Sequence, residues 1–236
     1  MGNSARIVHL ALKVADLERA TRFYEDVFGF RQTGTGHARG HVSRHMTDGA
    51  FDLALMVYDS ENEHEAQLSG PGPCIHHFGI EVADRDAVAA KIVAEGGEII
   101  SDPNEGALKF RAPNGVVAEI TRPGRYRKAQ ISGARISGLT VATSNAAAAA
   151  DFYKTVFGFD ETSGDATARE LTDGTFRLTI LERAPAPAHH DHWTVAVADP
   201  DALAKSVAKH GAVATSEEST PLYHTPDGSL LEITAG

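Results

Sequence analysis

An internal repeat limits what this chain can fold into more strongly than any other feature. The stretch FYEDVFGF, from Phe23 to Phe30, returns as FYKTVFGF from Phe152 to Phe159. Three further landmarks recur in the same order: a Thr-Asp-Gly turn at 47–49 and 172–174, a histidine at His77 and His192, and a Gly-x-x-x-Glu motif ending at Glu119 and Glu232. Four matched landmarks in one order indicate two halves that share a fold.

A polar stretch separates the two halves. It contains Pro123, Gly124 and four basic residues, a composition typical of linkers. We therefore predict a first domain at 1–123, a linker at 124–133 and a second domain at 134–236. The first half is longer because of an insertion around 59–73, rich in Glu, Ser, Gly and Pro. This insertion is interpreted either as an acidic surface loop or as a lid over a site in the first half.

The pattern within each half predicts an α+β fold made of four βαβββ units. A helix is expected to run from a capping aspartate, Asp16, to Phe28. A second helix is expected at 86–94, with Val88, Ile92 and Val93 facing inward. The second half repeats these helices at 146–157 and 200–210, and alternating apolar runs between the helices predict strands.

Charge and composition exclude several classes of function. A net charge of −10 disfavours binding to nucleic acid or to anionic membranes. The single cysteine, Cys74, excludes an intrachain disulfide and fits a reducing compartment. No apolar run approaches the roughly 18 residues of a spanning helix, and the N-terminus lacks a signal-peptide core. We expect a cytoplasmic monomer or homodimer that acts on a small-molecule substrate, without nucleic-acid or membrane partners.

Polar residues interrupt three apolar runs of the first half. His9 lies within residues 7–14, His77 within 75–82, and Glu119 within 116–120. One buried histidine is usually a satisfied core residue, but three such interruptions on three strands suggest a shared purpose. Two neutral imidazoles and one carboxylate can hold a divalent metal and leave coordination positions open.

Taken together, these motifs resemble the vicinal oxygen chelate superfamily, which includes glyoxalase I, methylmalonyl-CoA epimerase, fosfomycin-resistance transferases and extradiol dioxygenases. The motifs that carry the resemblance are His9-x-x-Leu12-x-Val14 with Asp16, the helix end at 23–30, His77-Phe-Gly-Ile-Glu-Val, and Pro113-Asn-Gly-x-x-x-Glu119. The resemblance covers nearly the whole chain. It implies two tandem glyoxalase-like domains with curled mixed sheets, whose concave faces receive the substrate.

The resemblance also implies a set of metal ligands. His9, His77 and Glu119 would bind a divalent metal, with Fe or Mn favoured and Zn, Ni or Co as alternatives. The second half keeps His192 and Glu232 but has Gly138 where His9 would be. In this superfamily a site can also form across halves, which here would join His9 to His192 and Glu232. We expect the unmixed site in the first half and a degenerate site in the second.

The resemblance leaves the reaction open between three functions. Glyoxalase I and the epimerase take a fourth ligand, Glu or Gln, from the strand that corresponds to 51–57. Counting four residues on from Gly49 places the apolar Leu53 opposite the metal, and Asp52 on the other face unless a bulge turns it inward. This disfavours a glyoxalase-like lyase or isomerase of the lactoylglutathione lyase type. A non-enzymatic binding protein of the bleomycin-resistance kind is the further alternative, although such proteins lack metal ligands.

An extradiol-type dioxygenase acting on a small aromatic or vicinal-oxygen substrate is therefore the leading hypothesis. We expect His45 and Lys109 to provide acid–base catalysis. Lys109 stands where those dioxygenases have a tyrosine, and their complete site usually lies in the second half rather than the first. The residues expected to line an aromatic-binding cavity are Phe51, Leu53, Leu55 and Phe110.

Overall fold

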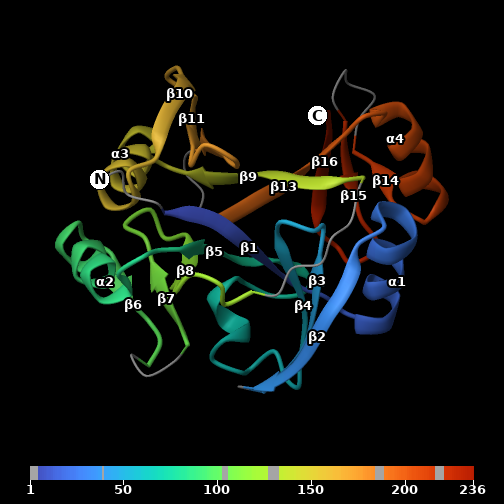
Figure 1. Cartoon of the computed structure of the whole chain (residues 1–236), viewed down its shortest axis with the longest axis horizontal. Helices are drawn as coiled ribbons and strands as arrows, with labels where there is room; N and C mark the ends of the chain where they lie inside the picture. The colour runs from blue at the N-terminus through green and yellow to red at the C-terminus, as the bar shows by residue number, and fades with distance from the viewer. Residues whose placement is uncertain (1–4, 39, 103–105, 127–132, 184–188, 216–220) are drawn as a thin grey trace. The chain divides into compact units, whose positions relative to one another are not determined.

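The computed structural model describes residues 5–38, 40–102, 106–126, 133–183, 189–215 and 221–236. These residues form two eight-stranded sheets and four α-helices (Figure 1). One strand, one helix and three strands follow one another four times along the chain. The predicted α+β class and the four βαβββ units are therefore confirmed.

The first half forms one mixed sheet with the strand order β2-β3-β4-β1-β5-β8-β7-β6. Strand β1 runs parallel to β4 and β5 runs parallel to β8, whereas the hairpin pairs are antiparallel. The elements are β1 (Arg6–Lys13), α1 (Leu17–Phe28), β2 (Arg31–Ala38), β3 (His41–Thr47), β4 (Asp52–Tyr58), the 3-10 helix η1 (Ala66–Leu68), β5 (Cys74–Glu81), α2 (Arg85–Ala94), β6 (Glu98–Ile99), β7 (Ala107–Arg111) and β8 (Val117–Thr121).

The second half repeats this sheet with the order β10-β11-β12-β9-β13-β16-β15-β14. Each strand occupies the place of the strand eight positions earlier, so the sequence repeat is also a structural repeat. The elements are β9 (Arg135–Thr143), α3 (Ala146–Phe157), β10 (Asp160–Gly164), β11 (Ala168–Thr172), β12 (Arg177–Glu182), β13 (His189–Val197), α4 (Pro200–Lys209), β14 (Val213–Ala214), β15 (Leu222–His224) and β16 (Leu230–Ala235).

Helices α1 and α3 begin and end at the residues that the sequence predicts. The Asp16 carboxylate accepts a hydrogen bond from the backbone N–H of Arg19 at 3.0 Å, which caps the start of α1. Gly29 ends the helix with a φ of 70°, a backbone conformation that favours glycine. In α3, Asn145 and Gly158 serve the same two purposes. Because these signals are local, the sequence alone locates both helices.

Helix α2 departs from its prediction in one respect. Ile92 is fully buried, but Val93 is 56% exposed, so the expectation that Val93 faces inward is wrong. Successive residues lie about 100° apart around a helix, and Ile92 and Val93 therefore cannot both face the sheet. The helix is capped by Asp84 and starts one residue before the predicted 86–94.

No helix in the described parts of the chain is long and apolar enough to cross a membrane.

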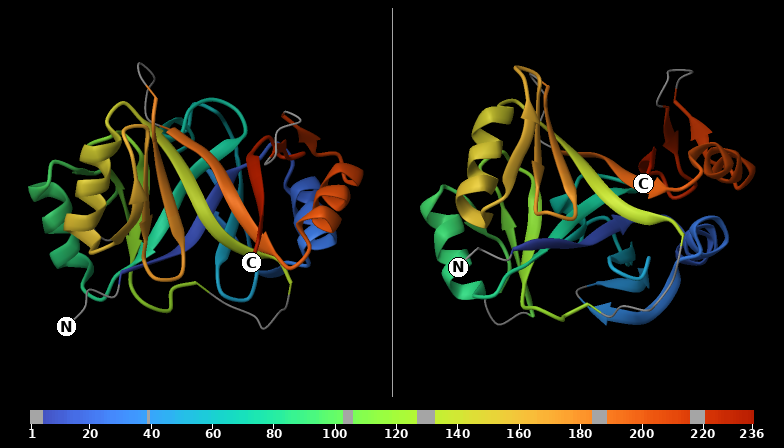
Figure 2. Two further views of the ribbon diagram at one scale, coloured as in Figure 1. Left: turned by 90° about the horizontal axis from the view of Figure 1, so that it is seen from above. Right: turned by 45° about the horizontal axis from the view of Figure 1, so that its top comes forward.

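The chain forms two compact units, each of which combines modules from both halves. The first unit contains α2 with β6–β8 and α3 with β10–β12, and the second contains α1 with β2–β4 and α4 with β14–β16. Helix α2 packs beside α3 in the first unit, and α1 packs beside α4 in the second (Figures 1 and 2). The domain division at 1–123 and 134–236 stays a prediction. The predicted linker at 124–133 lies largely outside the described residues.

Aspartates of the recurring Thr-Asp-Gly turn join the two halves inside each unit. In the first unit the backbone N–H of Ile7 donates to Asp173 Oδ2 at 2.6 Å. In the second, the N–H of Ile136 donates to Asp48 Oδ2 at 2.8 Å. The other oxygen of Asp48 accepts a hydrogen bond from Phe51 N within its own turn. One carboxylate thus holds both its turn and the first strand of the other half, which gives the repeated motif a structural role.

In the second unit, a buried tyrosine of the first half forms a hydrogen bond with a residue of the second half. The Tyr24 hydroxyl donates a hydrogen bond to Asp227 Oδ2 at 2.6 Å. Burial raises the pKa of Tyr24 well above its usual value, and the Asp227 carboxylate adds to that shift. Trp193 packs on Tyr24 with ring centroids 5.9 Å apart and donates its indole N–H to Ser229 Oγ at 3.2 Å. Tyr24 and Trp193 thus contribute aromatic surface to the core of this unit while their own polar atoms are hydrogen-bonded.

We expect Tyr24→Phe to lower the free energy of unfolding by about 1–3 kcal/mol, because a buried oxygen of Asp227 would lose its donor. Urea unfolding followed by the fluorescence of Trp193, the only tryptophan, measures the change. Tyr223→Phe is the matched control, since no hydrogen bond joins the hydroxyl of this buried tyrosine to any described residue. The control should stay within about 0.5 kcal/mol of the parent. Equal effects of the two variants would show that the bond to Asp227 contributes nothing specific.

Candidate metal centre

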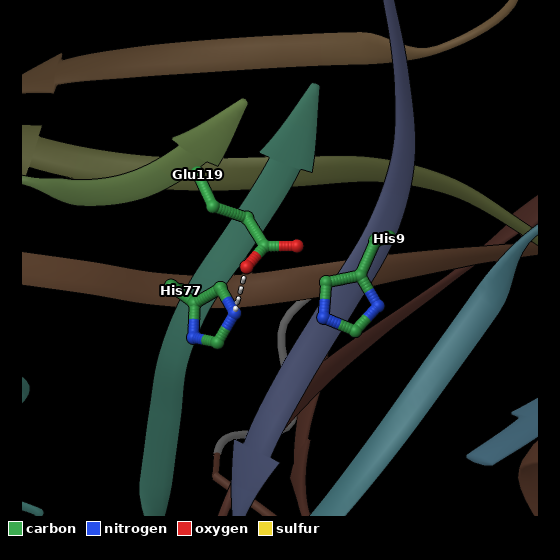
Figure 3. A group of neighbouring side chains, drawn as sticks. All are labelled: His9, His77 and Glu119. Atoms are coloured by element: carbon green, nitrogen blue, oxygen red, sulfur yellow. Dashed lines mark ion pairs between the residues drawn. The ribbon is translucent and has the colours of Figure 1, made fainter. Parts of the chain in front are cut away.

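Three neighbouring strands carry the polar residues that interrupt the apolar runs. His9 lies on β1, His77 on β5 and Glu119 on β8, and their exposed fractions are only 2%, 3% and 4%. One potential ligand atom of each lies within 4.8 Å of those of the other two. Figure 3 shows the three side chains directed toward one another. Among the described residues this is the one group of three such side chains, and it belongs wholly to the first half.

His77 and Glu119 approach each other most directly. His77 Nε2 lies 3.4 Å from Glu119 Oε2, as the dashed line in Figure 3 marks. Lys109 stands opposite Glu119 in the β7–β8 pair and is also buried. The lysine predicted to assist catalysis therefore lies on the strand beside the carboxylate. Its ammonium group is a positive charge that can balance the carboxylate in a low-dielectric interior.

Asp52 holds the imidazole of His9 and that of His45. Its Oδ2 lies 2.7 Å from His9 Nδ1 and 2.9 Å from His45 Nδ1. Burial by itself would raise the pKa of Asp52, but hydrogen bonds from His45 and His9 outweigh it, so the net shift is downward. An ionised carboxylate only accepts hydrogen bonds. This geometry suits a proton on Nδ1 of each ring, which would leave the lone pair of a neutral His9 on Nε2, the atom that faces away from Asp52.

The position of Asp52 corrects the expectation for β4. Asp52 lies on the same side of the sheet as His9, and Leu53, which is fully buried, lies on the other. The turn between Thr47 and its partner Asp52 contains four residues, whereas the corresponding turn between β7 and β8 contains five. Counting four residues on from Gly49, as from Gly115 to Glu119, therefore assigns the face of β4 one residue out of register. A shift of one residue exchanges the two faces of a strand.

The residues predicted to line an aromatic-binding cavity build the core instead. Leu53 and Leu55 alternate with Asp52 along β4, so they face away from His9. Phe110 is fully buried and packs against Phe152 and Phe157 of α3, at centroid distances of 6.3 and 5.9 Å. Phe51 is likewise a buried residue of the apolar core. The prediction that these four residues line a cavity is therefore wrong.

Two features of the site escaped sequence reasoning. One is the role of Asp52, and the other is Tyr126, which follows β8 and is half-buried. The Tyr126 ring stacks on His9, with centroids 4.3 Å apart and an angle of 9° between the planes. It also lies 6.2 Å from the ring of His45, which is itself 6.2 Å from His9. In the sequence, the only feature that could have pointed to Tyr126 was its position as a lone aromatic residue in a basic linker.

The insertion at 59–73 is fastened to the side of β1 that carries His9. Lys13 is four residues on from His9 in the same strand, so the two side chains share a face. The buried Lys13 ammonium donates to Ala66 O at 3.2 Å, to Gly70 O at 2.6 Å and to Glu61 at 2.9 Å. The insertion is therefore an anchored cover on this face and not a freely solvated loop.

The second half lacks both members of the His9–Asp52 pair. Gly138 pairs with Arg177 between β9 and β12, as His9 pairs with Asp52 between β1 and β4. Glu232 Oε2 accepts a hydrogen bond from the Thr194 hydroxyl at 2.7 Å. The second half therefore replaces both His9, the proposed ligand, and Asp52, the acceptor of its hydrogen bond. The degenerate site at His192 and Glu232 stays a prediction.

The three side chains of the first half fit a divalent metal by their chemistry. Two imidazoles and one carboxylate are the donor set of non-haem oxygenases that use a facial triad. Burying such groups is unfavourable unless they are paired or bind an ion. The Asp52 carboxylate behind His9 repeats the carboxylate–histidine arrangement found around many protein-bound metals.

Four βαβββ units in two mixed sheets, with this donor set on the central strands, define a fold of the vicinal oxygen chelate type. Residues 6–120 match the sequence model of the Glyoxalase/Bleomycin resistance protein/Dioxygenase superfamily, and residues 138–234 match that of the Glyoxalase-like domain. The chain belongs to this superfamily.

Individual relatives cover most or half of the chain. Over 229 residues it is 24% identical to the anthracycline biosynthesis protein DnrV of Streptomyces peucetius, covering 87% of this chain and 82% of that protein. Over 131 residues it is 27% identical to the lactoylglutathione lyase of Haemophilus influenzae, covering 52% of this chain and 88% of that protein. The 2,3-dioxygenase LapB from Pseudomonas sp. KL28 has a similar structure, with a TM-score of 0.70, 16% identity and coverage of 98% and 92%. The last likeness concerns the fold alone.

Proposed function

We propose that this protein is a divalent-metal-dependent enzyme that acts as an extradiol-type dioxygenase on a small aromatic or vicinal-oxygen substrate. The observation that carries the proposal is the convergence of His9, His77 and Glu119. Three protein ligands leave neighbouring coordination positions for the two oxygens of a substrate. Asp52, which stands near the place where a lyase would need a fourth ligand, is engaged by two imidazoles instead.

Each residue of the site has a distinct part in this proposal. Fe(II) or Mn(II), or alternatively Zn(II), Ni(II) or Co(II), would polarise the substrate oxygens and, if redox-active, exchange electrons. His9, through Nε2, together with His77 and Glu119 would hold the ion. His45 is 31% exposed at its side chain and has its Nδ1 fixed by Asp52, which suits Nε2 to accept a proton from a substrate hydroxyl. Lys109 would balance the charge of Glu119.

A glyoxalase-like lyase or isomerase is the second candidate function. The sequence identity of 27% with a lactoylglutathione lyase favours it. Proton abstraction next to a carbonyl needs a base beside the substrate, and the Asp52–His45 pair supplies one. A binding protein of the bleomycin-resistance kind is the third possibility, and the buried ligand set counts against it.

Oxygen consumption separates these functions. The protein is purified anaerobically, analysed for metals, and loaded with Fe(II) or Mn(II). We expect oxygen uptake with catechols, coupled to formation of a ring-opened product, and no uptake by the His9→Ala variant. Absence of uptake together with turnover of a thiol hemiacetal would replace the dioxygenase by the lyase. Binding of an aromatic ligand with no retained metal and no turnover would favour the sequestering protein.

A further inference from the structure

Two imidazoles of this site, those of His9 and His45, share the carboxylate of Asp52. Its Oδ2 lies 2.7 Å from His9 Nδ1 and 2.9 Å from His45 Nδ1, and its Oδ1 lies 3.2 Å from His45 Nδ1. Only 1% of Asp52 is exposed, so water cannot readily replace it as the acceptor. The donor set formed by His9, His77 and Glu119 does not explain this arrangement.

We propose that Asp52 is a positioning residue that fixes both imidazoles in the tautomer protonated at Nδ1. His9 is thereby prepared to bind a metal through Nε2, and His45 is held next to it with Nε2 directed away from the carboxylate. The inference rests on the proposed metal binding by His9. It adds that the geometry of the ligand is already set in the metal-free protein.

The Tyr126 ring provides a second restraint on His9. Asp52 selects one of the two flipped orientations of the imidazole, because the hydrogen bond requires Nδ1, and not Cδ2, on the side of the carboxylate. Tyr126 fixes the plane itself, since the two rings are 4.3 Å apart and nearly parallel at 9°. A ring held in both ways loses little conformational entropy when it binds an ion. Tyr126→Phe should keep this restraint on the plane of the His9 ring, because the stacked ring remains. Tyr126→Ala should remove it.

The second half supports the view that ligand and acceptor act as one unit. At the position of His9 it has Gly138, and at the position of Asp52 it has Arg177, the cross-strand partner of Gly138. An arginine cannot accept a hydrogen bond from an imidazole. The half without the imidazole therefore also lacks the acceptor, as expected if the carboxylate serves the histidine.

Asp52→Asn tests the proposal with little change of shape. The amide is uncharged and replaces one acceptor oxygen by an N–H donor, so it cannot hold both rings in the same tautomer as firmly. Titration of the metal-free Asp52→Asn variant with Mn(II) should show binding about 10–100-fold weaker than that of the parent, the range typical when a partner of a metal-bound histidine is removed. Asp227→Asn is the matched control, because it alters a buried carboxylate of the second half and should leave Mn(II) affinity unchanged.

A second measurement needs no metal. Long-range 1H–15N correlation spectra of the metal-free protein report which nitrogen of each imidazole is protonated, and His9→Ala and His45→Gln assign the signals. We expect protonation at Nδ1 for both rings in the parent, and at Nε2, or a mixture, for at least one ring in the folded Asp52→Asn variant.

The outcomes separate this inference from the proposed function. If the parent binds Mn(II) and Asp52→Asn binds it within about threefold with unchanged tautomers, Asp52 is not a positioning residue, and the proposed function stands. If the parent itself binds no Mn(II), Fe(II), Co(II), Ni(II) or Zn(II), the proposed metal-dependent function is overturned, and with it the purpose assigned to Asp52.

Discussion

His9→Ala is expected to abolish stoichiometric metal binding and, with it, activity. The variant removes one of the three proposed ligands, so the loss of affinity should exceed the roughly 100-fold that removal of a supporting carboxylate can cause. Elemental analysis of anaerobically purified protein and Mn(II) titration measure the effect. Because the His9 imidazole is buried beside Asp52, thermal unfolding of the metal-free variant must be compared with that of the parent.

His192→Ala is the matched control in the second half. His192 corresponds to His77 in the repeat, and its removal should leave the metal content unchanged, whereas His77→Ala should lower it as His9→Ala does. If His192→Ala lost the metal and His77→Ala retained it, the ligands would be His9, His192 and Glu232. The complete site would then lie across the halves.

Phe110→Ala should lower the free energy of unfolding by about 3–5 kcal/mol, the range found when a buried aromatic ring is removed. Phe110 has no exposed surface and packs against Phe152 and Phe157, so the ring leaves a cavity that the neighbours fill only in part. Urea unfolding measures the change. Val93→Ala, at a position that is 56% exposed, should change stability by less than about 0.5 kcal/mol.

The same pair of variants tests whether Phe110 belongs to the core or to a substrate cavity. A core residue changes stability and leaves the KM of the folded enzyme nearly unaltered. A large rise in KM with unchanged unfolding would instead restore the cavity assignment made from the sequence.

Much of the fold was predictable because its signals are local or repeated. Asp16 and Gly29 mark the two ends of α1, and the same chemistry marks α3 through Asn145 and Gly158. Each cap satisfies backbone groups within a few residues, so no tertiary contact is needed to recognise it. The convergence of His9, His77 and Glu119 was also visible, since polar residues in apolar strands require a partner.

The orientation of β4 was not predictable by counting. Asp52 and Leu53 exchange faces when the preceding turn changes by one residue, and the sequence of the turn does not state how many residues it leaves unpaired. Tyr126 was missed for a different reason. Its contact with His9 joins residues more than a hundred positions apart and follows no periodic pattern.

The sequence also does not reveal which segments make up each compact unit. A repeat reveals which segments resemble each other, and it leaves open which segments pack together. The hydrogen bonds from Ile7 to Asp173 and from Ile136 to Asp48 connect each half to the other inside a unit. They depend on the tertiary arrangement rather than on any local preference.

The second unit, in which α1 packs beside α4, has a consequence for synthesis on the ribosome. Translation delivers α1 well before the segment from His192 onward, which completes its unit. Until then, the apolar face of α1 lacks its final neighbour, and contacts so distant along a chain form slowly. Nascent chains of this protein should therefore depend on chaperones that shield α1, and a pause in translation before His192 should lengthen that dependence.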